Sequence, residues 1–291
     1  MCLRGGHCSQ RVKQVGDIHG DFNQTQKVLR MAGLVDKDLQ WIGGPNTDFV
    51  QTGDVVDRGP DTIPLYQMLV RLYNESLSSP HGVYPLLGNH EIMNLSGDLR
   101  FVHQQDTTSF GSPFARANAW SAQGWIGAQL RGPMCYAALL LDGTVFVHGG
   151  ITPVWAQQGV DNLNARVCEA VRDGEWKHPV FAREAPLRYR GYALDPEWSV
   201  CGELQRALHL LGVSSAKRMV VGHTVQKGGK IRSRCGGAIY LIDVGITKQY
   251  GSNCAALEIV GDKVTALYCV EGNPDEAFRV DMTPRDFERD L

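Results

Sequence analysis

Residues 11–33, RVKQVGDIHGDFNQTQKVLRMAG, contain the pattern that decides the fold. The stretch Arg11–Val15 predicts a short strand, which ends at Gly16. Apolar residues spaced three or four apart then predict a helix over Asn23–Ala32, with Gly33 as its stop. A strand, a glycine corner and a helix in this order are typical of the first half of a βαβ unit.

The same order recurs over the first 90 residues. Asp48–Thr52 and Val83–Leu87 predict two further strands, and periodic apolar residues predict a helix after Asp61. The repeat indicates parallel strands joined by helices, and therefore an α/β fold. Residues 12–15, VKQV, contain two polar side chains, Lys13 and Gln14, so we expect the first strand to be edge-like or partly exposed, or the start of the gene model to be degraded.

The rest of the chain predicts short helices and antiparallel strands. The predicted helices are Arg116–Leu130 and Pro196–Leu211, and the predicted strands are Cys135–Leu141, Thr144–His148, Met219–Val221, Ala238–Val244, Ala255–Val260 and Val264–Val270. No linker-like segment interrupts them, so we expect one catalytic domain over 11–270, after a short extension over 1–10. Ten of the 21 residues in 271–291 are charged, which predicts a solvated C-terminal tail.

Composition narrows the class of protein. The 291 residues are 43% hydrophobic and 21% charged, with a net charge of −2, which fits a globular domain rather than a fibrous or disordered chain. The near-zero charge disfavours a nucleic-acid partner, and no apolar run is long enough for a membrane span. Eight cysteines without a CxxC pair favour reduced thiols in an intracellular, cytoplasmic protein. Organellar targeting stays open, because a natural leader could precede this start.

Five predicted strands end in a glycine corner beside a metal-binding residue type. The corners are VGDIHGD (15–21), TGDVVDRG (52–59), LLGNHE (86–91), FVHGG (146–150) and VVGHT (220–224). Taken singly, the two aspartate corners could be ordinary turns, Asn89 and His90 a turn residue and a core histidine, and His148 and His223 are more often satisfied core histidines. Binding sites of open α/β sheets lie beyond the carboxyl ends of the strands, so together the corners predict one shared site.

The residue types at these corners predict a pair of metal ions. Aspartate, asparagine and imidazole provide mixed oxygen and nitrogen ligands without thiolate, which suits Mn, Fe, Zn or Co. Asp54 is the best candidate to bridge two ions. Asp17 and His19 would complete the first ion, and Asn89, His148 and His223 would complete the second.

Such a pair indicates hydrolysis of phosphate esters. Two ions lower the pKa of bound water and stabilise both the attacking and phosphoryl oxygens, so a bridging hydroxide can attack phosphorus directly. The leaving alkoxide needs a proton, which His90 can give if the carboxylate of Asp57 orients it. Arg58 can bind phosphate oxygens through its planar guanidinium.

The five motifs, in this order, resemble the phosphoprotein phosphatase signature of the metallophosphoesterase superfamily over residues 11–270. The resemblance implies a calcineurin-like fold, a central β-sandwich of mixed sheets flanked by helices, and a phosphorylated protein as substrate, with Mn as the usual metal in vitro. The stretches DFNQTQKVLRMAGLVD and LLGNHEIMNLSGDLRFV are similar to the Shewanella-like branch. By that resemblance Arg190, in RYRGYA (188–193), is the second phosphate-binding arginine in preference to Arg188.

Two other functions remain open from the sequence. Dinucleoside tetraphosphatase-like hydrolases share the metal motifs, and a catalytically silent scaffold could keep the fold. A regulatory partner is possible, but no motif identifies one. The leading prediction is a metal-dependent protein phosphatase.

Overall fold

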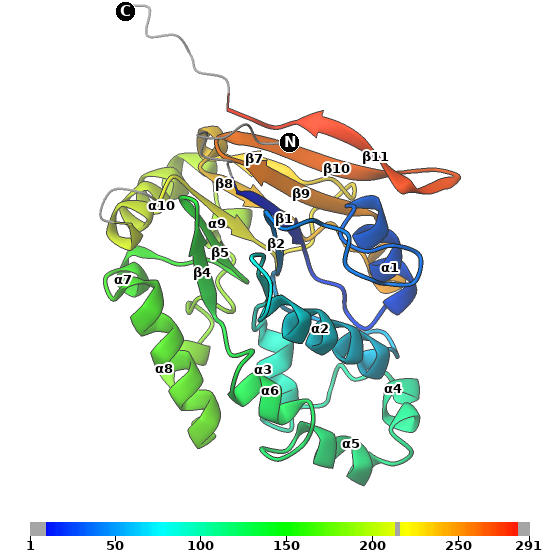
Figure 1. Cartoon of the computed structure of the whole chain (residues 1–291). Helices are drawn as coiled ribbons and strands as arrows, with labels where there is room; N and C mark the ends of the chain where they lie inside the picture. The colour runs from blue at the N-terminus through cyan, green and yellow to red at the C-terminus, as the bar shows by residue number, and fades with distance from the viewer. Residues whose placement is uncertain (1–9, 213–215, 285–291) are drawn as a thin grey trace, which may run out of the picture.

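The computed structural model describes residues 10–212 and 216–284, and its strands form two mixed sheets with helices around them (Figure 1). One sheet has the order β11-β10-β9-β1-β2-β3 and the other β4-β5-β6-β8-β7. The strands are β1 Arg11–Val15, β2 Thr47–Gln51, β3 Val83–Pro85, β4 Ala138–Leu141, β5 Thr144–Val147, β6 Arg218–Val221, β7 Arg232–Arg234, β8 Ile239–Leu241, β9 Ala255–Val260, β10 Lys263–Val270 and β11 Asn273–Asp281. Buried side chains of both sheets belong to one continuous core, and the predicted α/β class with mixed sheets is confirmed.

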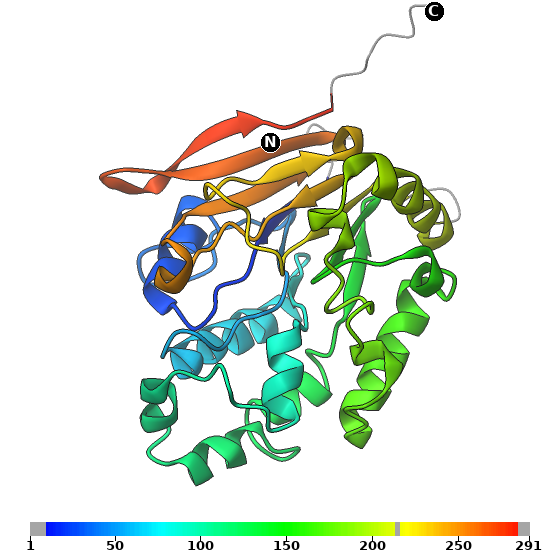
Figure 2. The ribbon, with the colours of Figure 1, turned by 180° about the vertical axis from the view of Figure 1, so that it is seen from behind.

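Helices cover the outer sides of the sheets and the lower part of the molecule (Figures 1 and 2). The α-helices are α1 Phe22–Met31, α2 Thr62–Ser76, α3 Asn89–Leu95, α4 Gln104–Ser109, α5 Pro113–Trp120, α6 Gly127–Arg131, α7 Pro153–Ala156, α8 Gly159–Asp173, α9 Gly191–Leu194 and α10 Glu197–Leu211. Helix α1 packs on β10 and β11, whereas α8 packs on β4. None of the helices in the described residues is long and apolar enough to cross a membrane.

The strand directions bring the predicted corners to one place. β1, β2 and β3 are parallel to one another, as the repeated strand-and-helix pattern predicts. In the second sheet β5, β6 and β8 are also parallel. The glycine corners after β1, β2, β3, β5 and β6 therefore converge although up to 206 residues separate them.

The prediction that the first strand is at an edge or partly exposed is wrong. β1 lies between β2 and β9, and four of its five residues are buried. The buried Lys13 side chain is tolerated because it has partners: its ammonium donates to the carbonyl of Ala32 and lies 3.9 Å from the carboxylate of Glu258. A buried lysine is stable in a sheet only when such groups replace water.

The prediction of short helices around Arg116–Leu130 is confirmed, but the range is wrong as one helix, because it holds two helices, α5 and α6, with a turn between them. Gly124 lies in that turn, where a Cβ atom would come within 2.0 Å of the carbonyl oxygen of Asn118. The chain therefore folds back tightly on the end of α5, which a continuous helix could not do.

Residues 273–281, predicted as part of a solvated tail, instead form the edge strand β11, which pairs antiparallel with β10. Most of its residues are exposed, so no buried apolar face distinguishes this strand from a solvated segment. Arg30 of α1 donates two hydrogen bonds of 2.8 Å to Asp275. Charged side chains are typical of edge strands because they discourage pairing with another chain.

The expectation of reduced thiols is wrong for the described cysteines. They form three disulfides, Cys135–Cys168, Cys201–Cys235 and Cys254–Cys269, with Cα–Cα distances of 5.8, 5.3 and 5.5 Å. The partners are 15 to 34 residues apart, so no local spacing rule announces the pairs. Cys2 and Cys8 lie outside the described residues.

Candidate metal centre

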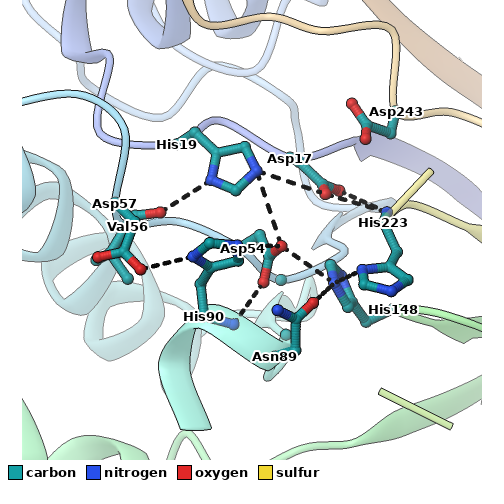
Figure 3. Close-up of polar contacts among 12 residues, drawn as sticks. Asp17, His19, Asp54, Val56, Asp57, Asn89, His90, His148, His223 and Asp243 are labelled. Atoms are coloured by element: carbon teal, nitrogen blue, oxygen red, sulfur yellow. Dashed lines mark hydrogen bonds and ion pairs between the residues drawn. The ribbon is translucent and has the colours of Figure 1, made fainter. Parts of the chain in front are cut away.

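The six predicted metal ligands meet in one buried cluster (Figure 3). Each follows a strand: Asp17 and His19 follow β1, Asp54 follows β2, Asn89 begins α3 after β3, His148 follows β5 and His223 follows β6. Two groups of possible ligand atoms share Asp54, one with His19 and His90 and the other with His148 and His223. The bridging position that the sequence predicts for Asp54 is therefore geometrically available.

The Asp54 carboxylate lies at the centre of this cluster. Its Oδ2 atom is 3.3 Å from Nε2 of His148 and 3.8 Å from Nε2 of both His19 and His90. Its Oδ1 atom accepts a hydrogen bond of 2.9 Å from the backbone N–H of His90. One oxygen is thus used to fix the carboxylate, and the other faces three imidazoles.

Backbone carbonyls fix the orientation of three histidines. Nδ1 of His19 donates to Val56 at 3.0 Å, Nδ1 of His148 donates to Thr52 at 2.8 Å, and Nε2 of His223 donates to Arg188 at 3.1 Å. The remaining nitrogen of each ring is then an unprotonated lone-pair donor directed into the cluster. Metal-bound histidines are held in this way in proteins.

Unprotonated nitrogens and carboxylate oxygens are all acceptors, so they repel one another when buried together and are stabilised by a cation between them. Nε2 of His148 lies 3.2 Å from Oδ1 of Asn89 and 3.1 Å from Nδ1 of His223. Asp243, which the sequence analysis did not single out, is 1% exposed, and its Oδ2 has no hydrogen-bond partner among the described residues. Such a collection of acceptors requires positive charge to be stable, so the residues present fit a metal centre.

Burial and the neighbouring charges also shift the pKa values of the predicted ligands. Burial, together with the charges of Asp243 and Asp54, raises the pKa of Asp17 well above its ordinary value. Burial lowers the pKa of His19 to about 4 and that of His223 to about 2. Histidines that stay neutral at physiological pH keep the lone pairs that metal binding needs.

His90 and Asp57 form a separate buried pair at the edge of the cluster. Nδ1 of His90 lies 2.6 Å from Oδ2 of Asp57, the arrangement that the sequence predicts for a proton donor and its orienting carboxylate. Burial alone would lower the pKa of His90, but Asp54 and Asp57 outweigh it and raise that pKa. Asn94, one helical turn after His90, donates to Oδ1 of Asp57 at 2.9 Å.

The residues that continue this chain of contacts belong to none of the five sequence motifs. Arg116 of α5 donates to Oδ1 of Asn94 at 2.7 Å and to Asp106 of α4 at 2.8 Å. Asp106 in turn accepts from the backbone N–H of Thr62 at 3.2 Å. The only sequence signal was the spacing of Asn94 four residues after His90, which places both on one helix face.

Glu91 was also missed, although it belongs to the GNHE motif. Its side chain is fully buried and accepts three backbone N–H groups, from Asp54 at 2.8 Å, Val55 at 2.9 Å and Gly88 at 2.7 Å. The carboxylate therefore ties the corner after β2 to the corner after β3. Burial and the charge of Asp54 raise the pKa of Glu91 to about 6.

The predicted phosphate-binding arginines line a cavity of about 780 Å³ above the cluster, together with Asn89, His90 and His223. The Arg58 guanidinium lies 4.1 Å above the ring of Phe101, and its Nε has no hydrogen-bond partner among the described residues. The Arg190 guanidinium has partners within the protein: it donates to the carbonyl of His223 at 2.6 Å and to the hydroxyl of Thr224 at 3.1 Å.

Comparisons with known proteins agree with this geometry. The sequence profile of calcineurin-like phosphoesterases matches residues 10–227. An uncharacterised protein of Schizosaccharomyces pombe is 38% identical over 85% of this chain and 76% of its own, and Shewanella-like protein phosphatase 2 of Arabidopsis thaliana is 29% identical over 82% and 72%. The crystal structure of a cold-active protein-tyrosine phosphatase from a psychrophilic Shewanella species superposes with a TM-score of 0.76 at 25% identity, covering 94% of this chain and 80% of that chain. A profile match over most of the chain and a cluster that fits two metal ions lead to one conclusion: the chain belongs to the calcineurin-like phosphoesterase family.

Proposed function

We propose that this metallophosphoesterase removes phosphate from phosphorylated proteins. The observation that carries the proposal is the pair of ligand groups sharing Asp54 at the base of a cavity lined by arginines. Relatives named as protein phosphatases support a phosphoprotein as the substrate class. The opening of the cavity beside the metal cluster gives an extended peptide access to it.

The metal ions would be held by Asp17, His19 and Asp54 on one side and by Asp54, Asn89, His148 and His223 on the other. When bound, two such ions supply a deprotonated water and electrostatic stabilisation of the phosphate. Asn89 is neutral, so the two carboxylates only partly compensate the ions and the centre keeps positive charge for the anionic substrate. Mn, Fe, Zn and Co fit the mixed nitrogen and oxygen ligands.

His90 would donate the proton that the leaving oxygen needs. Its Nδ1 is bound to Asp57, so Nε2 is the nitrogen that can give a proton into the cavity. Asp57 stabilises the protonated ring and keeps its orientation, and Asn94 holds Asp57 in turn. His90 lies close enough to His19 and Asp54 to be a possible metal ligand. We assign it to proton transfer instead, because the carboxylate of Asp57 stabilises its protonated ring.

The two arginines would bind the phosphoryl oxygens that face the cavity. Arg58 rests on Phe101, which fixes its guanidinium plane while leaving its N–H groups for the substrate. Arg190 is tied to the backbone of His223, so phosphate binding by Arg190 is coupled to the position of a metal ligand. Planar guanidinium groups suit phosphate because they donate two parallel hydrogen bonds.

A substrate panel tests the proposal. The protein is loaded with Mn²⁺, Fe²⁺, Zn²⁺ or Co²⁺, and phosphate release is measured from peptides carrying phosphoserine, phosphothreonine or phosphotyrosine and from a dinucleoside tetraphosphate. We expect the highest kcat/KM on a phosphopeptide. Faster cleavage of the dinucleotide would replace the proposal by the dinucleoside tetraphosphatase-like alternative, and inactivity with every metal would indicate a silent scaffold.

The disulfides change the compartment that we propose. Cytosolic reductants keep thiols reduced, and stable disulfides are typical of oxidising compartments. Three pairs among the described residues therefore favour folding in an oxidising compartment over the cytoplasmic location expected from the sequence. Mass spectrometry after alkylation without reduction tests this: protein isolated from its natural source should carry no label at Cys135, Cys201 or Cys254.

A further inference from the structure

The wall of the cavity carries more arginines than phosphate binding requires. Five arginines and three acidic residues line it: Arg58, Arg100, Arg183, Arg188 and Arg190, and Asp98, Glu184 and Asp195. Cationic side chains that face a cavity are either paired with carboxylates of the protein or left for an anionic ligand. The partners of each arginine separate these two cases.

Three of the five arginines already have partners. Arg100 donates to both carboxylate oxygens of Asp98, with its shortest contact at 2.6 Å. Arg183 lies 3.8 Å from the carboxylate of Glu184, and both side chains are largely exposed. Arg190 donates to the carbonyl of His223, as described above. The charges of Arg100 and Arg183 are thus paired with carboxylates or screened by water. The partners of Arg190 are neutral, so they orient its guanidinium without neutralising the charge that we assign to the phosphate.

Arg188 differs from them. Within residues 10–212 and 216–284 its guanidinium makes no hydrogen bond or ion pair, although the side chain is half-buried in the cavity wall. Burial lowers its pKa, whereas Asp54 at the centre and Asp98 at the rim oppose that effect. The guanidinium therefore lies within electrostatic reach of both the metal cluster and the outer wall. An unpaired, partly desolvated charge in this position is stabilised by an anionic ligand.

The backbone of Arg188 has a separate task, since its carbonyl accepts from Nε2 of His223 at 3.1 Å. This contact anchors the residue beside the metal cluster and leaves the side chain independent of it. A substitution at Arg188 changes the side chain without removing the carbonyl that orients the ligand.

We propose that Arg188 is a specificity-determining residue that binds an acidic group next to the phosphorylated residue of the substrate. Arg58 and Arg190 are the arginines assigned to the phosphate itself, so Arg188 is the additional cation on the same wall. The ligand class is a phosphopeptide with an aspartate or glutamate beside the phosphorylated residue. The inference rests on the proposed function.

Two peptides that differ only in the flanking charge test it. The phosphorylated residue is flanked on both sides by aspartate in one peptide and by asparagine in the other. We expect wild-type kcat/KM to be about tenfold higher for the aspartate peptide, and Arg188→Gln to abolish that ratio. Arg188→Lys should keep part of the preference, because it retains the charge without the planar fork.

Arg183→Gln is the matched control, since it removes an exposed arginine from the same wall and should keep the wild-type ratio. The preference should also weaken at high salt. Equal wild-type rates on the two peptides would overturn the inference, as would an equal loss on both in Arg188→Gln, which would assign Arg188 to the phosphate.

A binding measurement separates this inference from the proposed function. If wild-type protein hydrolyses p-nitrophenyl phosphate but neither peptide, the proposed function fails, and both peptides are then compared as inhibitors. Stronger inhibition by the aspartate peptide that Arg188→Gln removes would still support the role of Arg188. Equal inhibition by the two peptides would reject it.

Discussion

Nε2 of His148 lies 3.1 Å from Nδ1 of His223, although the other nitrogen of each ring already donates to a backbone carbonyl. Two lone pairs therefore face each other in a buried cluster. Asn89 adds a third acceptor at 3.2 Å from His148, and the one contact to a cationic group is a long one, 3.5 Å from a guanidinium nitrogen of Arg190 to Nδ1 of His223 among the described residues. This relationship links the stability of the fold to the cation that the site is built to hold.

Removal of metal should therefore destabilise the protein. Chelation should lower Tm, and added Mn²⁺ should restore it, because a ligand at 100 times its Kd stabilises the folded state by about 2.7 kcal/mol. Thermal unfolding followed by circular dichroism measures the shift. Asp54→Asn weakens both ligand groups and should reduce the metal-dependent part of Tm; an unchanged response to Mn²⁺ in that variant would contradict the central position of Asp54.

Substitution of His90 should matter most for poor leaving groups. General acid catalysis contributes typically about 10²–10⁴-fold, and that contribution falls when the leaving group needs no proton. His90→Asn should thus lose far more kcat on phenyl phosphate than on p-nitrophenyl phosphate. Asp57→Asn should show the same trend with a smaller loss, because it leaves the imidazole present but unoriented. Equal losses on both esters would remove the proton-donor role.

Gly88→Val should weaken metal binding while the core stays folded. A Cβ atom at Gly88 would come within 2.2 Å of Oδ1 of Asp54, so the carboxylate must move. Isothermal titration should show Mn²⁺ affinity weakened by at least about tenfold, or about 1.4 kcal/mol. Gly202→Ala in α10 is the control, since nothing lies within 4 Å of its Cβ; it should bind Mn²⁺ normally and be stabilised by up to about 1 kcal/mol.

Glu91→Ala should cost stability as well as activity. The change leaves three buried N–H groups without an acceptor, and each unsatisfied group costs about 1–3 kcal/mol before relaxation. We expect the free energy of unfolding in urea to fall by about 3 kcal/mol or more. Glu75→Ala on the exposed side of α2 removes only an i,i+4 pair with Arg71 and should change it by less than about 0.5 kcal/mol. A similar loss of unfolding free energy in the two variants would refute the inference that Glu91 holds the corners after β2 and β3 together.

Reduction of the disulfides should lower Tm in a way that oxidation reverses. Cys135 and Cys168 are 33 positions apart, and closing a loop of that length contributes about 3.7 kcal/mol in the chain-entropy description. A Cys135→Ala and Cys168→Ala double variant should account for part of the loss. A Tm insensitive to dithiothreitol, in protein whose thiols become accessible to alkylation, would show that the pairs add no stability.

Local patterns were sufficient where a residue's role depends on its neighbours in sequence. The strand and glycine corner around Asp17 and the one around Asp54 were found because each strand ends where its motif begins. The helix α10 also ends at Gly212 as its glycine stop predicts. The predicted helix Arg116–Leu130 is interrupted near Gly124, because a close contact with the end of α5, which the sequence does not reveal, outweighs helix periodicity.

Other features depended on partners far along the chain. β1 is polar but buried because Ala32 and Glu258 satisfy Lys13. β11 forms because an unpaired edge of β10 was available to it, and its own sequence is that of a tail. The cysteine pairs likewise follow from the packing of separate elements and not from their spacing.

The sequence by itself determined the five corners, the ligand types and the kind of chemistry, because these depend on residue identity and on strands that end beside them. The tertiary structure decided which atoms face one another: the carboxylate of Glu91 and, among residues 10–212 and 216–284, the oxygen of Asp243 and the guanidinium of Arg188 that have no partner. The physical reason is that burial and hydrogen-bond satisfaction are properties of three-dimensional neighbours. Residue identity determines which interactions a side chain can make, and packing determines whether its charge is already paired within the protein.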